Sequence, residues 1–451
     1  MLKNIFALLA AVAAAIASPA AAQTVINITE GTLKPHPIAI PTFAGEGGSD
    51  EIAQQITEVV RNNLVSTGLF AVPAEEAYIQ KDLDIQVQPR FADWRIINAN
   101  DLVVGRTELL ADGRLSVAFR LWDVYGEEVR RLEGQAGRQY VTTPDNWRRI
   151  AHKISDSIYT RLTGETGIFD SRIVYIAETG PPTARVKRLA IMDQDGANQQ
   201  YLTSGDFTVL TPRFSTSDQE ITYMSYEGGR PRVYLFNIQT GRQEVLGNFR
   251  GMTFAPRFAP DGRSVVMSQA DRGNSELFSM DLSTRQTRQL SDHPAIDTSP
   301  SMSPDGRQIA FTSDRGGSPQ IYVMNTNGAP LTCPSGGRDV ACRITFGDGR
   351  YSTPVWSPRG DLIAFTKQSQ GKFYIGVIGV DGKGERLLTG GDAYLDEGPS
   401  WSPNGRVIIF FRELRRGAGP TLWSVDLTGR NLRPLSTPTD ASDPAWSPLL
   451  D

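Results

Sequence analysis

Few residues in this sequence are suited to catalysis. The chain contains three histidines, His36, His152 and His293. His152 and Asp156 are four residues apart, so on a helix they would share one face, as a general base and its orienting carboxylate do. That face lies opposite the apolar stripe of the predicted helix, no nucleophile is placed beside it, and Gly-x-Ser-x-Gly does not occur. We therefore predict a solvated or interdomain hydrogen-bonded face, no catalytic residues and no enzymatic activity.

Two further groups have the residue types of a metal site. Asp193-Gln194-Asp195-Gly196 begins like a calcium loop but lacks the distal glutamate, and equivalent segments read TNG, VDG or LTG, which favours a turn. Cys333 and Cys342 are the only cysteines, and a zinc site would need four ligands although no histidine lies nearby. We predict a local disulfide between them and no bound metal or cofactor. The sequence leaves open whether a central channel holds an ion.

The elements that must position any site are repeated. A motif of the form Pro-x-aromatic or apolar-Ser/Ala-Pro occurs six times, with variations, at spacings of 44, 44, 54, 45 and 45 residues. The copies begin at Pro212, Pro256, Pro300, Pro354, Pro399 and Pro444. The long interval contains both cysteines, so we interpret its ten extra residues as an excursion closed by the predicted disulfide.

Each repeat has the pattern of four short strands. A two-residue turn such as Asp305-Gly306 follows the motif, and then come an apolar strand, a Gly-rich turn, an alternating strand, a third turn and a last short strand. Four strands in about 45 residues are typical of a β-propeller blade. The sixth motif ends the chain without its other strands, which instead precede the first motif, from Arg172 to Ser204. We therefore expect the C-terminal strand to close the ring.

The residues before the propeller do not follow the repeat. Apolar residues at helical spacing predict helices in DEIAQQITEVVRNNLVSTG and in PDNWRRIAHKISDSIYTRLTG, the second with Thr143 as its N-cap and Pro144 as its first residue. PIAIPTF, DLVVGRTELL, RLSVAFRLWDV and EEVRRLEGQAGRQYV read as strands. The predicted fold is therefore multidomain, with an N-terminal α/β sandwich over residues 23–166 and an all-β six-bladed β-propeller over residues 167–451.

The first residues have the features of a signal peptide. Lys3 precedes an apolar run from Ile5 to Ile16, and small residues precede Gln23. We predict that residues 1–22 are removed and that the mature chain is located in a bacterial periplasm, where a disulfide is stable. No later segment has 18 uninterrupted apolar residues, so we expect no direct membrane insertion. A net charge of −4 without long runs of one sign argues against nucleic-acid binding.

The segments just before each motif form the predicted binding site. Each segment crosses from the outer edge of one blade to the inner strand of the next, so all six meet at one mouth of the channel. Phe254, Tyr351 and Tyr394 stand there among small and acidic residues, a mixture suited to binding rather than to breaking bonds. We expect a monomer that binds a protein at this mouth. A propeller that binds cell-wall fragments or peptides is the alternative that fits the same features.

The sequence resembles the TolB family of the Tol-Pal system over the whole mature chain. The resemblance rests on the domain order, on HKISDSIYTRLTG in the first domain, and on FRGMTFAPRFAPDG at the second motif. It implies a non-enzymatic periplasmic adaptor that binds the lipoprotein Pal at the channel mouth and TolA through its mature N-terminus, and that supports outer-membrane integrity and cell division. By position, the implied Pal-binding residues are Met252, Thr253, Phe254, Ala255 and Thr298, to which we add the nearby Asp297, Tyr351 and Tyr394.

The resemblance assigns TolA binding to the segment QTVINITEG. Apolar residues alternate there with polar ones, a pattern suited to adding a strand to a partner's sheet edge or to docking on the chain's own domain. The candidate TolA-binding residues are Val25, Ile26, Asn27, Ile28 and Thr29.

Overall fold

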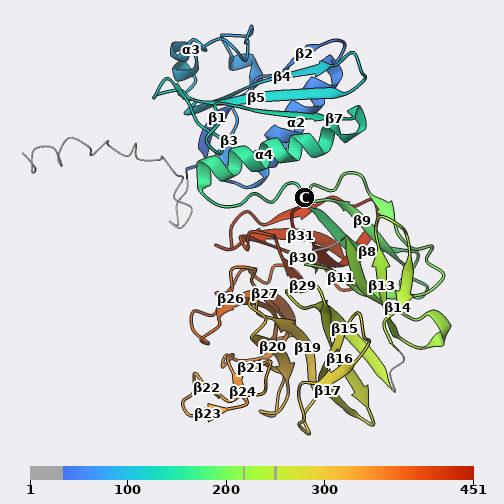
Figure 1. Cartoon of the computed structure of the whole chain (residues 1–451). Coiled ribbons are helices and arrows are strands. Elements are labelled where there is room, and N and C mark those ends of the chain that lie inside the picture. The colour runs from blue at the N-terminus through green and yellow to red at the C-terminus, as the bar shows by residue number, and fades with distance from the viewer. Residues whose placement is uncertain (1–33, 217–218, 248–250, 451) are drawn as a thin grey trace, which may run out of the picture.

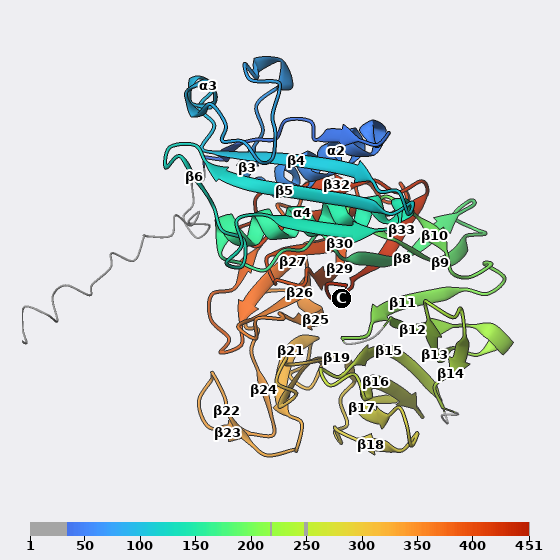
Figure 2. The ribbon, with the colours of Figure 1, turned by 45° about the horizontal axis from the view of Figure 1, so that its top comes forward.

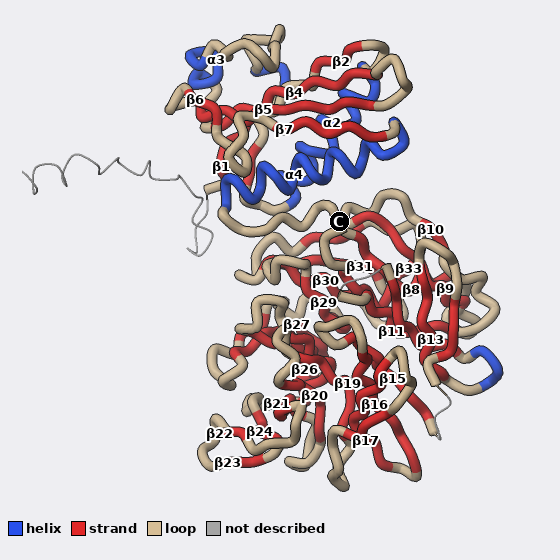
Figure 3. The backbone as a smooth tube through the Cα atoms, viewed as in Figure 1, coloured by secondary structure: helices blue, strands red, loops and turns tan. Residues whose placement is uncertain are grey.

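The chain folds into two domains that lie side by side (Figure 1). The computed structural model describes residues 34–216, 219–247 and 251–450. Helices gather in the N-terminal domain, whereas the larger domain consists almost entirely of strands and loops (Figure 3). This architecture confirms the predicted fold class, an α/β domain followed by a six-bladed propeller. Within the described residues, no helix combines the length and apolar character needed to cross a membrane.

A mixed sheet of seven strands forms the centre of the N-terminal domain. Its main path is β3-β1-β4-β5-β6, while β2 pairs with β4 and β7 pairs with β5. The pairs of β1 with β3 and with β4 are parallel, and β4 and β5 are antiparallel. The strands are β1 (His36–Ala39), β2 (Ala44–Glu46), β3 (Phe70–Ala71), β4 (Asp101–Leu109), β5 (Leu115–Asp123), β6 (Glu128–Val129) and β7 (Arg138–Thr142).

Two long helices cover one face of this sheet. In α2 (Asp50–Ser66) and α4 (Trp147–Thr163) the apolar side chains recur at helical spacing, and both stripes are buried in one apolar core. The shorter α3 (Phe91–Ile96) contributes to a second apolar cluster on the other face of the sheet. The chain also forms the single 3-10 turns η1 (Glu75–Ala77), η2 (Pro144–Asn146) and η3 (Glu227–Gly229).

The second long helix begins later than the sequence predicts. Thr143 precedes the 3-10 turn η2, which contains Pro144, and α4 begins only at Trp147. Proline fits the first turn of either helix type, and 3-10 turns often lead into α-helices. Pro144 therefore predicts where the helical segment begins, but not whether its first turn is 3-10 or α. Gly164 ends the helix in the left-handed conformation, with φ of 74°.

Six four-stranded antiparallel sheets form the propeller, and we number each blade by the motif that it contains. Blade 1 consists of β11 (Val209–Phe214), β12 (Glu220–Ser225), β13 (Arg232–Asn237) and β14 (Gln243–Val245). Blade 2 consists of β15 (Met252–Phe258), β16 (Ser264–Asp271), β17 (Asn274–Asp281) and β18 (Thr287–Gln289). Blade 3 consists of β19 (Asp297–Met302), β20 (Gln308–Ser313), β21 (Gln320–Asn325) and β24 (Ala341–Arg343).

The remaining three blades complete the ring. Blade 4 consists of β25 (Arg350–Trp356), β26 (Leu362–Ser369), β27 (Lys372–Gly379) and β28 (Arg386–Leu387). Blade 5 consists of β29 (Leu395–Trp401), β30 (Val407–Glu413), β31 (Thr421–Asp426) and β32 (Arg433–Leu435). Blade 6 joins the two ends of the domain and consists of β33 (Asp440–Trp446), β8 (Arg172–Thr179), β9 (Val186–Asp193) and β10 (Gln200–Tyr201).

The last strand of the chain closes the ring. In Figure 2, β33 lies beside β8, with which it pairs in antiparallel register. The indole Nε1 of Trp446 donates to the Ser171 hydroxyl at 2.8 Å, and the Arg172 N–H donates to Ser447 Oγ at 2.8 Å. Because β8 would otherwise expose an unpaired edge, this pairing removes a site for aggregation.

Residues of the repeated motif connect neighbouring blades. Ser301 of blade 3 accepts a hydrogen bond from the Trp356 N–H of blade 4 at 3.0 Å. The Trp401 indole of blade 5 donates to the Val355 carbonyl of blade 4 at 2.9 Å. These buried bonds explain why serine and tryptophan recur in the motif, because the serine satisfies a polar group of the next blade and the tryptophan one of the preceding blade.

The excursion in blade 3 lies between β21 and β24. Its strands β22 (Leu331–Thr332) and β23 (Arg338–Asp339) form a two-stranded sheet of their own. Cys333 and Cys342 form a disulfide, with their Cα atoms 5.1 Å apart. Most residues between the cysteines are exposed, so the excursion is an appendage of the blade.

Candidate functional site

The first strand of each blade lines the central channel. Neighbouring first strands contact one another around the whole ring, and Figure 2 shows β11, β15, β19, β25 and β29 around its centre. All six strands begin at one face of the propeller and end at the other. We name these the strand-start face and the strand-end face. The segments that the sequence nominated for binding lie at the strand-start face.

A bulge interrupts every one of these inner strands. The residue just before the motif proline has positive φ, and the pairing with the second strand shifts register there. The six residues are Thr211, Ala255, Ser299, Thr353, Gly398 and Asp443, with φ of 49°, 49°, 55°, 48°, 69° and 50°. Only one is glycine, so the ring imposes a conformation that costs a residue with a Cβ about 1 kcal/mol. No local sequence pattern predicts this conformation.

Five of the eight nominated residues, among them Ala255, present accessible atoms at the strand-start face. Met252 begins β15 and is 46% exposed. Phe254 and Thr298 are partly exposed on the neighbouring inner strands of blades 2 and 3. Tyr394 is also partly exposed, and its backbone N–H donates to the Glu413 carbonyl at 3.0 Å. These positions combine apolar and polar atoms, as protein-binding surfaces do.

Three other nominated residues are buried, which corrects their expected role as contact residues. The Thr253 side chain is 2% exposed, and Tyr351 is fully buried with its hydroxyl donating to Glu385 at 2.7 Å. Asp297 is also fully buried and accepts from Arg315 at 2.7 Å. A partner cannot reach these side chains without rearrangement. The aromatic ring of Tyr351 packs between blades instead, because its hydrogen bond to Glu385 satisfies the only polar atom of the ring.

The strand-start face also carries apolar side chains that the motif alignment missed. They lie in the loops that enter an inner strand or that connect the second and third strands, and both kinds of loop open on this face. Their exposed fractions are 47% for Phe207, 38% for Tyr226, 47% for Ile296, 52% for Phe346 and 52% for Leu414. Exposed apolar groups concentrated on one face indicate an interaction surface.

A carboxyl group on the inner strand of blade 5 titrates near neutral pH. Burial, together with the charge of Asp443 on β33, raises the pKa of Glu397 from 4.5 to about 7. Both residues precede the motif proline of their strands. The channel between the two faces therefore changes charge within the physiological pH range.

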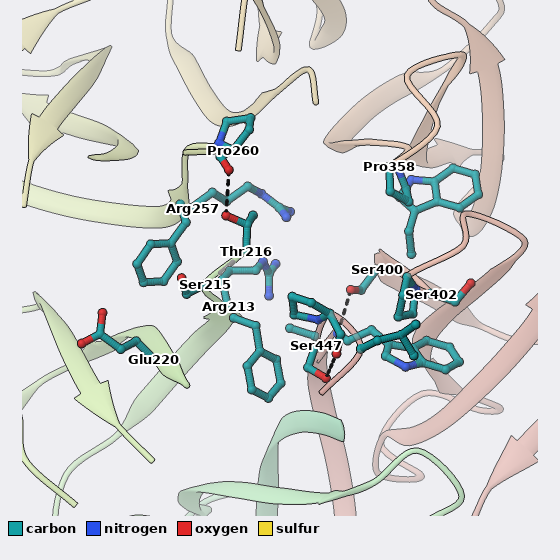
Figure 4. Close-up of a pocket in the computed structure, with 18 of the residues that line it drawn as sticks. Arg213, Ser215, Thr216, Glu220, Arg257, Pro260, Pro358, Ser400, Ser402 and Ser447 are labelled. Carbon is teal, nitrogen blue, oxygen red and sulfur yellow. Dashed lines mark hydrogen bonds between the residues drawn. The ribbon is translucent and has the colours of Figure 1, made fainter. Parts of the chain in front are cut away.

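The channel ends in a cavity at the strand-end face. The cavity has a volume of about 1180 Å³, and it is lined by the motif residues and by Thr166 from the interdomain linker. Figure 4 shows Arg213 and Arg257 on one side of this space, and Ser400 and Ser447 across it. The two ends of the channel thus differ in chemistry, one apolar and exposed, the other lined by arginine and serine.

His152 and Asp156 lie at the domain interface, the second of the two predicted alternatives for this helix face. His152 is 3% exposed, because the propeller covers this side of α4. Its Nδ1 lies 3.0 Å from the amide of Asn63, and Gln194 of the propeller donates to the same Asn63 at 3.0 Å. The two Asp156 oxygens accept from the N–H groups of residues 169 and 170, both at 2.8 Å. The interdomain alternative therefore describes this face.

The same interface contains the one cluster of metal-ligand residue types in the described part of the chain. His152 Nε2 and carboxylate oxygens of Asp193 and Asp195 lie within 4.8 Å of one another. The Arg148 guanidinium, however, lies 3.5 Å from Asp193 and 2.5 Å from Asp195. A dication would compete with a positive charge that already pairs with both carboxylates. We assign the cluster to an ion network that joins α4 to blade 6.

Both domains match known families. Residues 159–450 match the family model described as TolB beta propeller domain, and residues 24–129 match the model described as TolB amino-terminal domain. The chain belongs to the TolB family. It is 29% identical to TolB from Acinetobacter baumannii, with a TM-score of 0.78 and coverage of 93% of this chain and 98% of that chain. A putative TolB from Agrobacterium tumefaciens is 18% identical, with a TM-score of 0.47 and coverage of 60% and 91%.

Membership of the TolB family makes this chain a propeller component of the Tol-Pal system, in a family of non-enzymatic proteins. The candidate TolA-binding residues Val25, Ile26, Asn27, Ile28 and Thr29 lie outside the described residues. Within the described part of this TolB-family chain, the strand-start face is accordingly the candidate site for a partner.

Proposed function

We propose that this chain is a non-enzymatic adaptor of the periplasm that binds Pal at the strand-start face and TolA through its mature N-terminal segment. Residues 1–22 would be removed on export. By binding an outer-membrane lipoprotein and a protein of the inner-membrane machinery, the adaptor supports outer-membrane integrity and cell division. The location rests on the signal-peptide pattern and on the Tol-Pal family assignment.

One observation supports the Pal site most directly. Exposed apolar side chains gather on the face that also carries the positions implied by the resemblance, Met252, Phe254 and Thr298. Protein-binding surfaces place apolar anchors among satisfied polar groups, and the ion pair of buried Asp297 with Arg315 connects β19 to the loop after β20. A rigid ring reduces the entropy that is lost when a partner binds.

Calorimetric titration with purified Pal tests this site. The double variant Met252→Ala/Phe254→Ala should bind at least about tenfold more weakly, because central apolar anchors contribute most to affinity. Tyr201→Ala/Val245→Ala is a matched control, since both residues are exposed but lie on the outermost strands of their blades. Equal affinity of the first variant and the parent would reject the site. Saturable binding of soluble cell-wall fragments, without binding of Pal, would favour the alternative propeller function.

A truncation tests the second partner. Removing residues 23–34 should eliminate TolA binding and leave Pal binding unchanged, because the two sites are formed by different parts of the chain. Surface-immobilised TolA and Pal provide the two readouts on the same preparation. Loss of both interactions, or of neither, contradicts this assignment.

A further inference from the structure

The second residue of each motif occupies the same place in the ring. The six residues at this place are Arg213, Arg257, Ser301, Val355, Ser400 and Ala445, and all of them line the strand-end cavity. Two neighbouring blades therefore contribute arginine, where the other four contribute a small or apolar residue. None of the six positions holds an acid. The repeat thus creates a local excess of positive charge on one side of the cavity.

These two arginines differ from the other arginines of the propeller interior. Arg315 pairs with buried Asp297 at 2.7 Å, and Arg412 pairs with buried Asp396 at 2.7 Å. By contrast, among the described residues neither Arg213 nor Arg257 has a carboxylate within 4 Å. Arg213 donates one bond, to the carbonyl of the preceding proline at 2.6 Å. Among the described residues the two guanidinium groups therefore lack an anionic partner, and because both side chains are partly exposed to the cavity, an anion that enters it can reach them.

The charges around the pair do not neutralise it. Burial and the neighbouring charge of Arg213 lower the pKa of Arg257, although a guanidinium remains protonated at any physiological pH. Asp443 is close enough to oppose the effect of burial on Arg213, but its carboxylate lies 3.3 Å from the Thr211 N–H, from which it accepts. Glu220 also lines the cavity, and Figure 4 places its carboxylate apart from both guanidinium groups.

The rest of the cavity leaves room for more than an anion. Its volume of about 1180 Å³ exceeds the range of roughly 300–1,000 Å³ that is usual for small-molecule sites. Trp356, Trp401 and Trp446 line its other side, and each of their indole N–H groups already donates within the protein. These tryptophans are largely buried, so they contribute only a narrow apolar edge to the cavity wall.

We propose that the strand-end cavity is an anion-binding site, in which Arg213 and Arg257 together bind the carboxylate or phosphate group of a ligand. The N–H groups of a planar guanidinium are spaced to match two oxygens of a carboxylate or phosphate, which they bind through paired hydrogen bonds. This site lies at the opposite end of the channel from the proposed Pal surface. It is therefore independent of the proposed function.

Thermal melting and calorimetry of the mature chain test the proposal. Inorganic phosphate and citrate, compared with chloride at equal ionic strength, separate the two kinds of oxyanion. We expect at least one of them to raise the Tm by about 2 °C or more. Arg213→Ser/Arg257→Ser should lose this shift and weaken binding at least about tenfold. Serine is the natural residue at the same place in blades 3 and 5, so the backbone accepts it.

A second pair of arginines provides the control. Arg263→Ser/Arg307→Ser removes the same charge from exposed turns next to the motif, and should keep the shift. Absence of any shift in the parent beyond chloride, or equal shifts in both double variants, would overturn the proposal. In chloride alone, Arg213→Ser/Arg257→Ser should melt no lower than the parent, because it removes unpaired like charges. A lower Tm in chloride would instead assign the two arginines a structural role.

Discussion

The two faces of the propeller are made by the same six inner strands, yet they differ in chemistry. At the strand-start face, loops carry exposed apolar residues such as Ile296, Phe346 and Leu414. At the strand-end face, the same strands end in buried tryptophans and serines around a cavity that contains Arg213 and Arg257. In the described part of the chain, Val340 in the blade 3 excursion is the one large apolar side chain exposed in the connections of the strand-end face.

The difference shows where a repeat protein acquires function. Positions that every blade shares, such as the motif proline and the bulged residue before it, build the ring. Positions that differ between blades are free to vary because the ring does not depend on them, and binding chemistry accumulates there. Arg257 and Ser301 illustrate this, since both occupy the same place in successive blades.

Opening the ring should have the largest effect, because both faces depend on the closed ring of inner strands. Deletion of residues 444–451 leaves the first part of β8, at Ile173 and Val174, without its partner strand and removes the Trp446 anchor. We expect the propeller to lose cooperative unfolding in differential scanning calorimetry, and both Pal and oxyanion binding to disappear with it. A melt that matches the parent would show that the ring does not need its last strand.

A substitution inside the channel should change stability without belonging to either face. The pKa of Glu397 is about 7 in the folded state against 4.5 as its ordinary value, so the folded chain binds more protons between these pH values. The stability associated with this group is therefore present below about pH 4.5 and is lost as pH rises through 7. Glu397→Gln, which stays neutral, should be more stable than the parent by about 3 kcal/mol at pH 8 and similar to it at pH 4.5.

Urea unfolding at several pH values measures this difference. Asp156, whose pKa burial raises to about 6, changes stability in the same direction, but it is present in both proteins and cancels in the comparison. A constant difference between Glu397→Gln and the parent across pH would contradict the expected burial of a neutral carboxyl group.

Each double variant should have a smaller effect on the ligand of the opposite face than on the ligand of its own face. Arg213→Ser/Arg257→Ser should change the Kd for Pal less than about twofold, and Met252→Ala/Phe254→Ala should change oxyanion binding equally little. The reason is that about five residues of strand, roughly 17 Å, separate Met252 from Arg257 along β15. Each variant is titrated with both ligands. A tenfold cross effect would show that the channel couples its two ends.

Local patterns predicted the architecture well. Turn residues, strand alternation and the spacing of the motif are properties of a few neighbouring residues, so six blades and the preceding α/β domain could be recognised from sequence alone. The α2 and α4 helices likewise lie within a few residues of the predicted positions, since their apolar stripes are long and regular.

Properties set by neighbouring blades were not predictable in this way. Tyr351 reads as an exposed anchor in its own segment, but the adjacent blade buries it. His152 reads as part of a polar helix face, but the propeller covers that face. The proximity of Arg213 to Arg257 was also not predictable, because 44 residues separate them in the chain and only the closed ring places them in one cavity. Burial and charge arise from contacts between elements, which local periodicity does not encode.

Removing the disulfide should have the smallest effect, since the excursion lies outside both faces. A cross-link over nine residues could stabilise the chain by up to about 3 kcal/mol if it restricted only the unfolded state. The exposed hairpin of β22 and β23, however, can also loosen in the folded Cys333→Ser/Cys342→Ser variant, so both states regain entropy. We therefore expect a loss below about 1 kcal/mol in urea unfolding, faster amide exchange in residues 327–343, and unchanged binding of Pal and phosphate. A loss near 3 kcal/mol with protected amides would show that the hairpin stays ordered without its cross-link.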